Sequence, residues 1–229
     1  MTEPLFDRSF GAFLFDMDGT ILDSIAAAER VWSVWATRHG IDAASFLPTI
    51  HGMRATETMR RQNLAGIDLA AEAAWLTQAE MDDVEGITAI SGAASFLNGL
   101  PGDRWAIVTS APRKLALRRL EAAGLPVPAM MVTGEEVENG KPAPDCFLLA
   151  ASRLGLDPAD CLVFEDAPAG IAAAEAAGTA LAVITATHRH PTEIRHPTLT
   201  GYDDVRGLPD QNGWLTVSRQ VRLLEKAEA

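Results

Sequence analysis

The sequence has little cysteine and little positive charge. Only two of its 229 residues are cysteine, Cys146 and Cys161. Both lie inside apolar runs, so we expect buried thiols rather than a disulfide framework or a zinc site. Nineteen lysine and arginine residues stand against 31 aspartate and glutamate residues, a formal net charge of −12. No basic stripe is visible, so we expect no nucleic-acid partner, and only a local cationic pocket could hold a phosphate group.

Signals for export and for membranes are also missing. Met1–Arg8 carries acidic residues and lacks the basic start and apolar stretch of a signal peptide. The longest apolar run is far below the ~18 residues that a membrane span needs. Hydrophobic residues make up 48% of the chain and charged residues 22%, which excludes disorder as its main state. We therefore expect a cytoplasmic protein without a membrane partner, present as a monomer or weak dimer.

Five short apolar runs are typical of buried strands, because their residues do not alternate with polar ones. They are Ala12–Phe15, Trp105–Val108, Met130–Val132, Cys161–Phe164 and Leu181–Ile184. Helix-like stretches, each starting at proline and stopping before glycine, separate the last four: Pro112–Ala123, Pro144–Leu154 and Pro168–Ala177. Repeated strand–helix–strand units predict right-handed crossovers and a parallel sheet, so the expected fold class is α/β with a Rossmann-like core.

A long segment interrupts this rhythm after the first strand. Almost ninety residues without a convincing strand separate Phe15 from Trp105. Helices are predicted at Ser24–His39, Ala55–Leu64 and Leu69–Met81, followed by Ser91–Leu100, which returns to the sheet. We predict a helical cap at residues 24–87, inserted into a core made of residues 1–23 and 88–229. The C-terminal stretch predicts a strand at Trp214–Val217 and a terminal helix, with no assignable chemistry.

Polar residues follow each predicted strand, at the edge of the sheet where ligands bind. They are Asp16 and Asp18, then Thr109 and Ser110, then Lys141, and finally Glu165 and Asp166. So many carboxylates need a cation, and hard oxygen ligands of this kind suit Mg²⁺. The hydroxyl groups and the lysine suit phosphate oxygens. The sequence predicts a phosphoryl-transfer site, and it contains no glycine-rich loop with a following Lys-Ser/Thr, which excludes a P-loop.

These groups, in this order, resemble the four motifs of the haloacid dehalogenase-like hydrolases. The resemblance starts at Asp16-Met17-Asp18-Gly19-Thr20 and runs over roughly Phe10 to Ile184. It implies that Asp16 is the nucleophile that forms an aspartyl-phosphate, and that Asp18 is the general acid and then the base. The carboxylates of Asp16 and Asp166 and the backbone carbonyl of Asp18 would hold Mg²⁺, with Glu165 supporting them. Ser110 or Thr109, with Lys141, would neutralise the phosphoryl group. The predicted substrate-binding residues are Thr20, Thr109, Ser110, Ala111, Lys141, His51 and Arg54.

The insertion is similar to the helical cap of the sugar-phosphatase and β-phosphoglucomutase branch. Ile50–Thr56 looks like the cap loop of the hexose- and polyol-phosphate phosphatases, which is why His51 and Arg54 are candidate substrate contacts. The simpler interpretation is that both lie on a surface loop and that Arg54 pairs with Glu57. The resemblance implies a Mg²⁺-dependent phosphatase acting on a small sugar or polyol phosphate ester.

Three other functions remain open. A phosphosugar mutase would want a cap histidine soon after the Asp-Gly motif, but Leu22–Glu29 has none, and Thr20 replaces the valine common in mutases. A phospho-receiver domain would carry its acceptor on a middle strand. A non-catalytic binding module would show a broken motif.

Two residue groups have competing interpretations. The tryptophans of the predicted cap could pack in its core or stack on a sugar, and packing is the favoured interpretation for Trp32, Trp35 and Trp75. His188, His190 and His196, with Glu193, could form a metal cluster, but the nearby prolines favour a surface loop.

Overall fold

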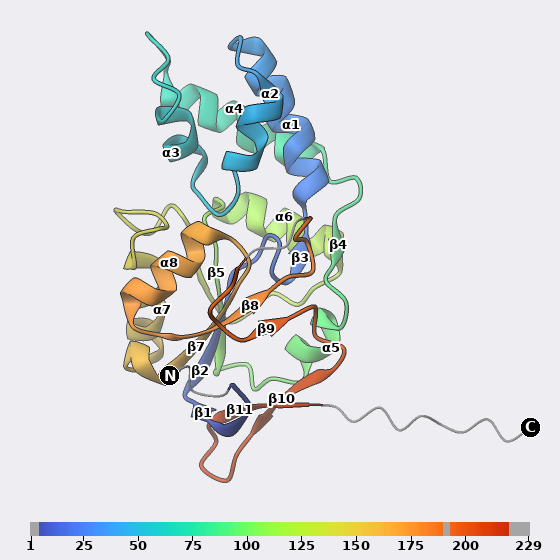
Figure 1. Ribbon diagram of the computed structural model, residues 1–229, viewed down its shortest axis with the longest axis vertical. Helices are drawn as coiled ribbons and strands as arrows, with labels where there is room; N and C mark the ends of the chain where they lie inside the picture. Colours follow the sequence, from blue (N-terminus) through green and yellow to red (C-terminus); the bar gives the residue numbers. More distant parts are fainter. Residues whose placement is uncertain (1–4, 190–192, 220–229) are drawn as a thin grey trace, which may run out of the picture.

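A parallel sheet forms the centre of the molecule (Figure 1). The computed structural model describes residues 5–189 and 193–219. The sheet has six strands in the order β6-β5-β2-β7-β8-β9, and every neighbouring pair is parallel. In chain order these are β2 (Ala12–Phe15), β5 (Trp105–Val108), β6 (Met130–Val132), β7 (Cys161–Glu165), β8 (Ala180–Ile184) and β9 (Thr198–Leu199). The five predicted strands are confirmed to within one residue at each end, and β9 is an addition too short to leave a pattern.

Helices cover both faces of this sheet. They are α5 (Ala93–Asn98), α6 (Arg113–Ala123), α7 (Asp145–Leu154) and α8 (Pro168–Ala177), and the predicted glycine stops follow the last three. Phe13 and Phe15 on β2 pack into a cluster with residues of α5 and α6, whereas Leu14 packs with residues of α7 and α8. The expected α/β architecture with two covered faces is therefore confirmed. No helix in the described part of the chain is long and apolar enough to cross a membrane.

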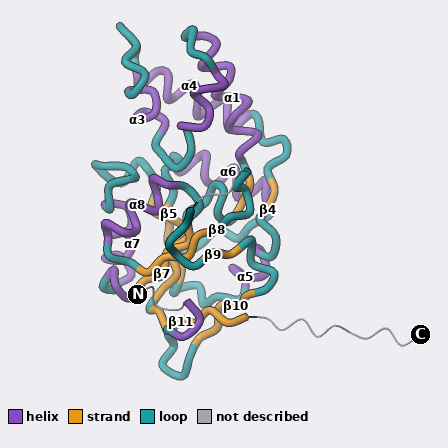
Figure 2. The backbone as a smooth tube through the Cα atoms, viewed as in Figure 1, coloured by secondary structure: helices purple, strands orange, loops and turns teal. Residues whose placement is uncertain are grey.

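The insertion forms a layer of helices above the sheet, which we call the cap. It contains α1 (Ile25–Arg38), α2 (Ala43–Phe46), the 3-10 helix η2 (Leu47–Thr49), α3 (Ala55–Arg60) and α4 (Leu69–Asp82). Figure 2 shows the cap as helix and loop, joined to the core beside the short ribbon of β3 (Leu22–Asp23) and β4 (Thr88–Ala89). The helix expected over Ala55–Leu64 ends earlier because the chain turns at Asn63, whose φ is 52°. The boundaries at residues 24 and 87 stay a prediction.

The cap has its own apolar core. Trp32 and Trp35 are buried in it with their ring centroids 5.5 Å apart, as the packing interpretation requires. Trp75 is partly buried against the same cluster, and the Arg38 guanidinium lies 4.2 Å from the centre of its ring. Since the cap packs internally, it can present a fixed surface to the sheet edge below it.

A small antiparallel sheet lies at the opposite end of the core. Its order is β1-β11-β10, with β1 at Ser9–Phe10, β10 at Val205–Pro209 and β11 at Leu215–Arg219. The strand predicted at Trp214–Val217 falls on β11, whereas the predicted terminal helix falls largely on residues 220–229, outside the described residues. Tyr202, just before β10, is buried and donates a hydrogen bond to the carbonyl of Thr20 at 3.2 Å. The C-terminal segment thereby supports the loop after β2.

Candidate active site

A buried lysine joins the ends of three strands of the central sheet. Lys141, in the loop after β6, is 1% exposed. Its ammonium group donates to Asp16 Oδ1 at 2.5 Å and to Glu165 Oε1 at 2.8 Å. It also donates to the carbonyl of Val108, the last residue of β5, at 3.1 Å. The sequence prediction that these groups converge at one sheet edge agrees with this geometry.

The site gathers three carboxyl groups around the single ammonium group of Lys141. Burial raises the pKa of Asp16 to about 8, against the opposing effect of Lys141. Burial, with the Glu165 and Asp16 charges, also raises the pKa of Asp166 well above its usual value. Burial alone would lower the pKa of Lys141, but the Asp16 and Glu165 carboxylates raise it above the ordinary lysine value. These shifts show a site that stabilises added positive charge.

Three of the carboxylates are close enough to share a metal ion. Each of the three residues, Asp16, Glu165 and Asp166, is buried and offers one carboxylate oxygen, and these three oxygens lie within 4.8 Å of one another. Buried carboxylate oxygens are the donors that Mg²⁺ accepts, usually with waters and substrate phosphate completing its shell. The donor set and the three carboxyl groups around one ammonium group therefore fit a divalent cation of this class.

Glu165 accepts more hydrogen bonds than the other two carboxylates of this group. Its Oε2 accepts the backbone N–H groups of Asp166 at 2.7 Å and Ala167 at 2.8 Å, just before α8. Its Oε1 accepts from Lys141. A Cβ on Gly170 would lie 1.5 Å from that oxygen, so only glycine leaves room for it. Glu165 thus caps the start of α8 and holds Lys141, which fits the predicted supporting role.

The loop after β2 is fitted around Asp166. The Thr20 hydroxyl donates to Asp166 Oδ1 at 3.2 Å. A Cβ on Gly19 would lie 2.1 Å from Asp166 Oδ2, and the φ of Gly19 is +85°. The Asp-Gly-Thr segment therefore places Asp16 and Asp166 side by side, and Thr20 acts in this structure by orienting Asp166.

Asp18 contacts groups from both the cap and the core. Its Oδ1 accepts a hydrogen bond from the Ser24 hydroxyl at 2.6 Å and lies 2.9 Å from an Arg119 guanidinium nitrogen. Arg119, on α6, also donates to Glu80 of the cap helix α4 at 3.1 Å. Ser24 stands at the N-cap position of α1, as predicted, but makes no side-chain cap hydrogen bond there. Sequence reasoning missed both Arg119 and Glu80.

The hydroxyl pair after β5 shapes the loop that leads into α6. Thr109 Oγ1 accepts the backbone N–H of Ala111 at 3.1 Å. Ser110 Oγ donates to the carbonyl of Gly52 in the cap at 3.0 Å. Pro112 is the N-cap residue of α6, so neither hydroxyl serves as the simple helix cap weighed from the sequence.

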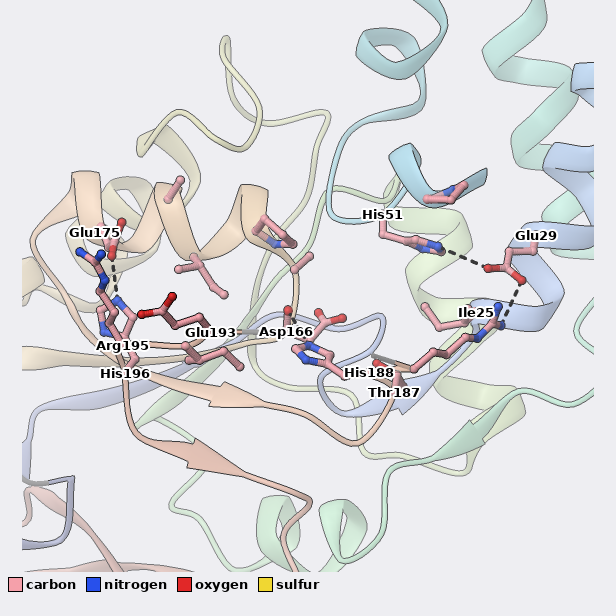
Figure 3. Close-up of a pocket in the computed structure, with 17 residues that line it drawn as sticks. Ile25, Glu29, His51, Asp166, Glu175, Thr187, His188, Glu193, Arg195 and His196 are labelled. Carbon is pink, nitrogen blue, oxygen red and sulfur yellow. Dashed lines mark hydrogen bonds and ion pairs between the residues drawn. The ribbon is translucent and has the colours of Figure 1, made fainter. Parts of the chain in front are cut away.

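Two neighbouring cavities open at this edge. The smaller, about 90 Å³ and here called the catalytic pocket, is lined among others by Asp16, Asp18, Thr109, Ser110, Ala111, His51, Glu80 and Arg119. The larger, about 610 Å³, runs beside α8 and includes Asp166 (Figure 3). The two share Ile25 and His51 in their walls. The catalytic pocket brings together most of the predicted substrate-binding residues.

The two cap-loop candidates are placed differently. His51 lines both cavities, and its Nε2 lies 3.6 Å from Glu29 Oε1 (Figure 3). Burial lowers the pKa of His51, although Glu29 opposes the shift.

Arg54 forms the predicted pair with Glu57, and its other N–H groups donate to three carbonyls of the loop before Lys141. These acceptors occupy its guanidinium, so substrate contact by Arg54 stays a prediction.

The described histidines of the segment after β8, His188 and His196, belong to no potential metal-binding group. His188 Nε2 lies 2.9 Å from the carbonyl of Asp166, which can only accept, so His188 donates there. His196 pairs with Glu175 at 2.7 Å, and His190 lies outside the described residues. Among the described residues, the one potential metal-binding group of three or more side chains is Asp16, Glu165 and Asp166. The surface-loop interpretation is therefore favoured.

Comparison with known proteins agrees with this arrangement. A model of the haloacid dehalogenase-like hydrolase family matches residues 10–178. Hexitol phosphatase A of Escherichia coli (strain K12) is 47% identical over 179 residues, covering 76% of this chain and 82% of that protein. 2-Deoxyglucose-6-phosphate phosphatase 2 of Saccharomyces cerevisiae is 32% identical over 196 residues, covering 76% and 80% respectively. The crystal structure of a hydrolase from Pseudomonas syringae superposes with a TM-score of 0.69 at 26% identity, covering 77% of this chain and 84% of that one. With its four motifs meeting at one sheet edge beneath a helical cap, the chain belongs to the haloacid dehalogenase-like hydrolase family.

Proposed function

We propose that this protein is a Mg²⁺-dependent phosphatase that hydrolyses a small sugar or polyol phosphate monoester through an aspartyl-phosphate. The observation that carries the proposal is the position of Asp16, which is buried, 2.5 Å from Lys141, and beside Asp18 in a small pocket. The names of the relatives, a hexitol phosphatase and a 2-deoxyglucose-6-phosphate phosphatase, support this substrate class.

In the proposed first step an oxygen of Asp16 attacks phosphorus. The ester P–O bond breaks, its electron pair stays on the leaving oxygen, and Asp18 donates a proton to that oxygen. Proton transfer of this kind is typically worth ~10²–10⁴ in rate. Lys141 and the Ser110 hydroxyl offset the negative charge of the transferring group. In the second step a water molecule attacks phosphorus, and Asp18, now a carboxylate, takes a proton from that water. The bond between phosphorus and Asp16 breaks, which releases phosphate and restores Asp16.

Asp16, Asp166 and the backbone carbonyl of Asp18 would hold Mg²⁺ in this scheme, with Glu165 orienting Lys141 and the start of α8. When bound, the ion supplies positive charge that draws the phosphate and the nucleophile together. The cap would exclude bulk water and select the substrate, with His51 as a contact to its hydroxyl groups. We also propose that the protein acts in the cytoplasm and that it is a monomer or a weak dimer. Both are expectations from the sequence.

A phosphosugar mutase is the second candidate, since the first step would be identical. The absence of histidine from Leu22–Glu29 favours hydrolysis. A requirement for a bisphosphate activator, with isomerised rather than dephosphorylated product, would favour the mutase. A phospho-receiver domain no longer fits, because the chain belongs to a different family.

The test is a phosphate-release screen over phosphorylated sugars and polyols, with and without Mg²⁺. We expect Mg²⁺-dependent release from hexitol or hexose phosphates. Asp16→Asn is expected to abolish turnover and to leave the fold intact, as checked by circular dichroism. A variant that keeps more than about a tenth of the wild-type rate would exclude Asp16 as a covalent nucleophile.

A further inference from the structure

A buried arginine reaches the catalytic pocket from a helix outside the four motifs. Arg119 is 6% exposed and lies on α6. Its guanidinium contacts Asp18 Oδ1 at 2.9 Å through one terminal nitrogen and Glu80 Oε1 at 3.1 Å through the other. All three residues line the catalytic pocket. Since a buried charge is costly without partners, Arg119 depends on these two carboxylates.

The contacts of Asp18 are uneven between its two oxygens. Within residues 5–189 and 193–219, both of its side-chain contacts, to Ser24 and to Arg119, fall on Oδ1. An oxygen that accepts from two donors has no place for a proton of its own. When Asp18 is protonated, its proton therefore sits on Oδ2.

We propose that Arg119 is a positioning residue for the general acid, and that Glu80 in turn holds Arg119. The inference rests on the proposed function, in which Asp18 protonates the leaving alcohol. Arg119 and Ser24 both contact Oδ1 and so restrain the orientation of the Asp18 carboxyl group. In that orientation the proton on Oδ2 faces the ester oxygen. As the P–O bond breaks, that proton passes from Oδ2 to the leaving oxygen, which keeps the bonding electron pair, and Asp18 is left ionised with its charge facing Arg119.

Glu80 makes this arrangement depend on the cap. It is 7% exposed, on α4, and the Arg119 contact crosses from the cap to the core. Burial raises the pKa of Glu80, although Arg119 opposes the shift. The Arg119 Nε is buried without a partner among the described residues, so its terminal nitrogens carry all of its contacts. Loss of Glu80 would release Arg119 from one side and loosen its hold on Asp18.

The nature of the leaving group separates positioning from general structural support. An alkoxide leaves poorly and needs the proton, whereas p-nitrophenolate leaves without one. A misplaced Asp18 therefore slows formation of the aspartyl-phosphate from an alkyl ester much more than from p-nitrophenyl phosphate. The later attack of water is the same for every ester and does not enter kcat/KM, so kcat/KM is the quantity to compare. Damage to the fold or to the phosphate site would slow both esters alike.

The experiment measures kcat/KM of the full chain with Mg²⁺ on three esters: glucitol 6-phosphate, butyl phosphate and p-nitrophenyl phosphate. Butyl phosphate is an alkyl ester without hydroxyl groups, so it needs the proton but offers no hydroxyl contact to the pocket. For Arg119→Met we expect kcat/KM to fall by ~10²-fold on both alkyl esters, the lower end of the rate effect of a proton transfer, and by only a few-fold on the aryl ester. Arg119→Lys keeps the charge and is expected to recover part of the loss on the hexitol phosphate. Arg118→Ala is the control, because that side chain lies on the same helix and donates to Glu121 and to the carbonyl of Met81 in the cap, but none of its contacts in the described part of the chain is to Asp18 or Glu80.

Equal losses on the alkyl and aryl esters, a loss confined to glucitol 6-phosphate, or no loss on any ester would overturn the inference while the proposed function stands. Wild-type protein that releases phosphate from none of the three esters would overturn the proposed function, and this inference with it. If Arg119→Met does not fold, Glu80→Gln takes its place, since it preserves packing and weakens the hold on Arg119. The same selective loss of kcat/KM on the two alkyl esters is expected from it, and a loss shared equally by the aryl ester would contradict the inference.

Discussion

Lys141→Met removes the buried cation that two carboxylates share. Lys141 lies 2.5 Å from Asp16 and 2.8 Å from Glu165 and is 1% exposed. Breaking a buried ion pair costs ~3–5 kcal/mol, because the remaining charge is left without compensation. A proton on Asp16, whose pKa is about 8, offsets part of that charge near neutral pH. We therefore expect a loss near 3 kcal/mol at pH 7, which for a chain of this size lowers Tm by roughly 6–12 °C.

The loss of unfolding free energy in the Lys141→Met variant, relative to the wild type, should grow with pH. The pKa of Asp16 is raised from 3.8 to about 8 on folding, so the stabilisation from its bound proton is complete below the unfolded value and is lost as pH rises through about 8. Wild-type protein then still has Lys141 to face the Asp16 charge, whereas the variant does not. Added Mg²⁺ should raise the Tm of the variant more than that of the wild type, because the ion replaces the lost positive charge.

Thermal unfolding in a chelating buffer, at about pH 6 and about pH 9, checks this reasoning, followed by the same scans with Mg²⁺. Lys114→Met is the matched control, because Lys114 is exposed on α6. A Lys141→Met protein within about 2 °C of wild type at both pH values would refute the estimate, since it corresponds to less than about 1 kcal/mol.

Three further predictions concern the surroundings of this site. As a predicted contact to substrate hydroxyl groups, Arg54 when changed to Ala should lower kcat/KM more on glucitol 6-phosphate than on butyl phosphate or p-nitrophenyl phosphate; equal losses on all three esters would instead assign its guanidinium to holding carbonyls of the loop before Lys141. Gly170→Ala should lower the free energy of unfolding by ~1–3 kcal/mol and reduce kcat, because its Cβ would lie 1.5 Å from Glu165 Oε1, whereas Gly99→Ala, whose Cβ would lie 3.4 Å from the Phe96 carbonyl oxygen, should change Tm little. Mg²⁺ affinity measured by calorimetry should increase as pH is raised from 6 to 8, by about ten-fold per pH unit for each ligand carboxyl group, Asp16 or Asp166, that must lose a proton to bind the ion; constant affinity from pH 6 to 8 would contradict this.

The central sheet was predictable because its strands are continuous apolar runs that are buried on both faces. The same topology places the ends of β2, β5 and β7 at one edge, so strand positions alone indicated that Asp16, Ser110 and Asp166 meet. The small sheet was only partly predictable. β10 reads Val205-Arg-Gly-Leu-Pro209, in which glycine and proline weaken the strand pattern. Its pairing with β11 is a property of the folded chain that periodicity does not reveal.

The supporting contacts of the site depend on close approach between residues far apart in sequence. Gly170 looks like any glycine near the start of a helix, and only the position of Glu165 Oε1 explains it. Tyr202 lies in a segment with no motif, yet its hydroxyl reaches the carbonyl of Thr20, 182 residues earlier. Such contacts follow from how elements pack, and a single sequence carries no record of that.

Arg119 was partly predictable: the sequence indicates that it needs a partner, but only the fold shows which residues those partners are. It falls on the buried stripe of α6 with Leu115, Ala116 and Leu120, at helical spacing. A charged residue on an apolar stripe is costly unless paired, so the pattern already required a buried anionic partner. The partners come from a cap helix and from the loop after β2, and only the fold brings these together. A charged residue on an apolar helix face therefore points to a buried ion pair, and the folded structure identifies its partners, here the carboxylates of Asp18 and Glu80.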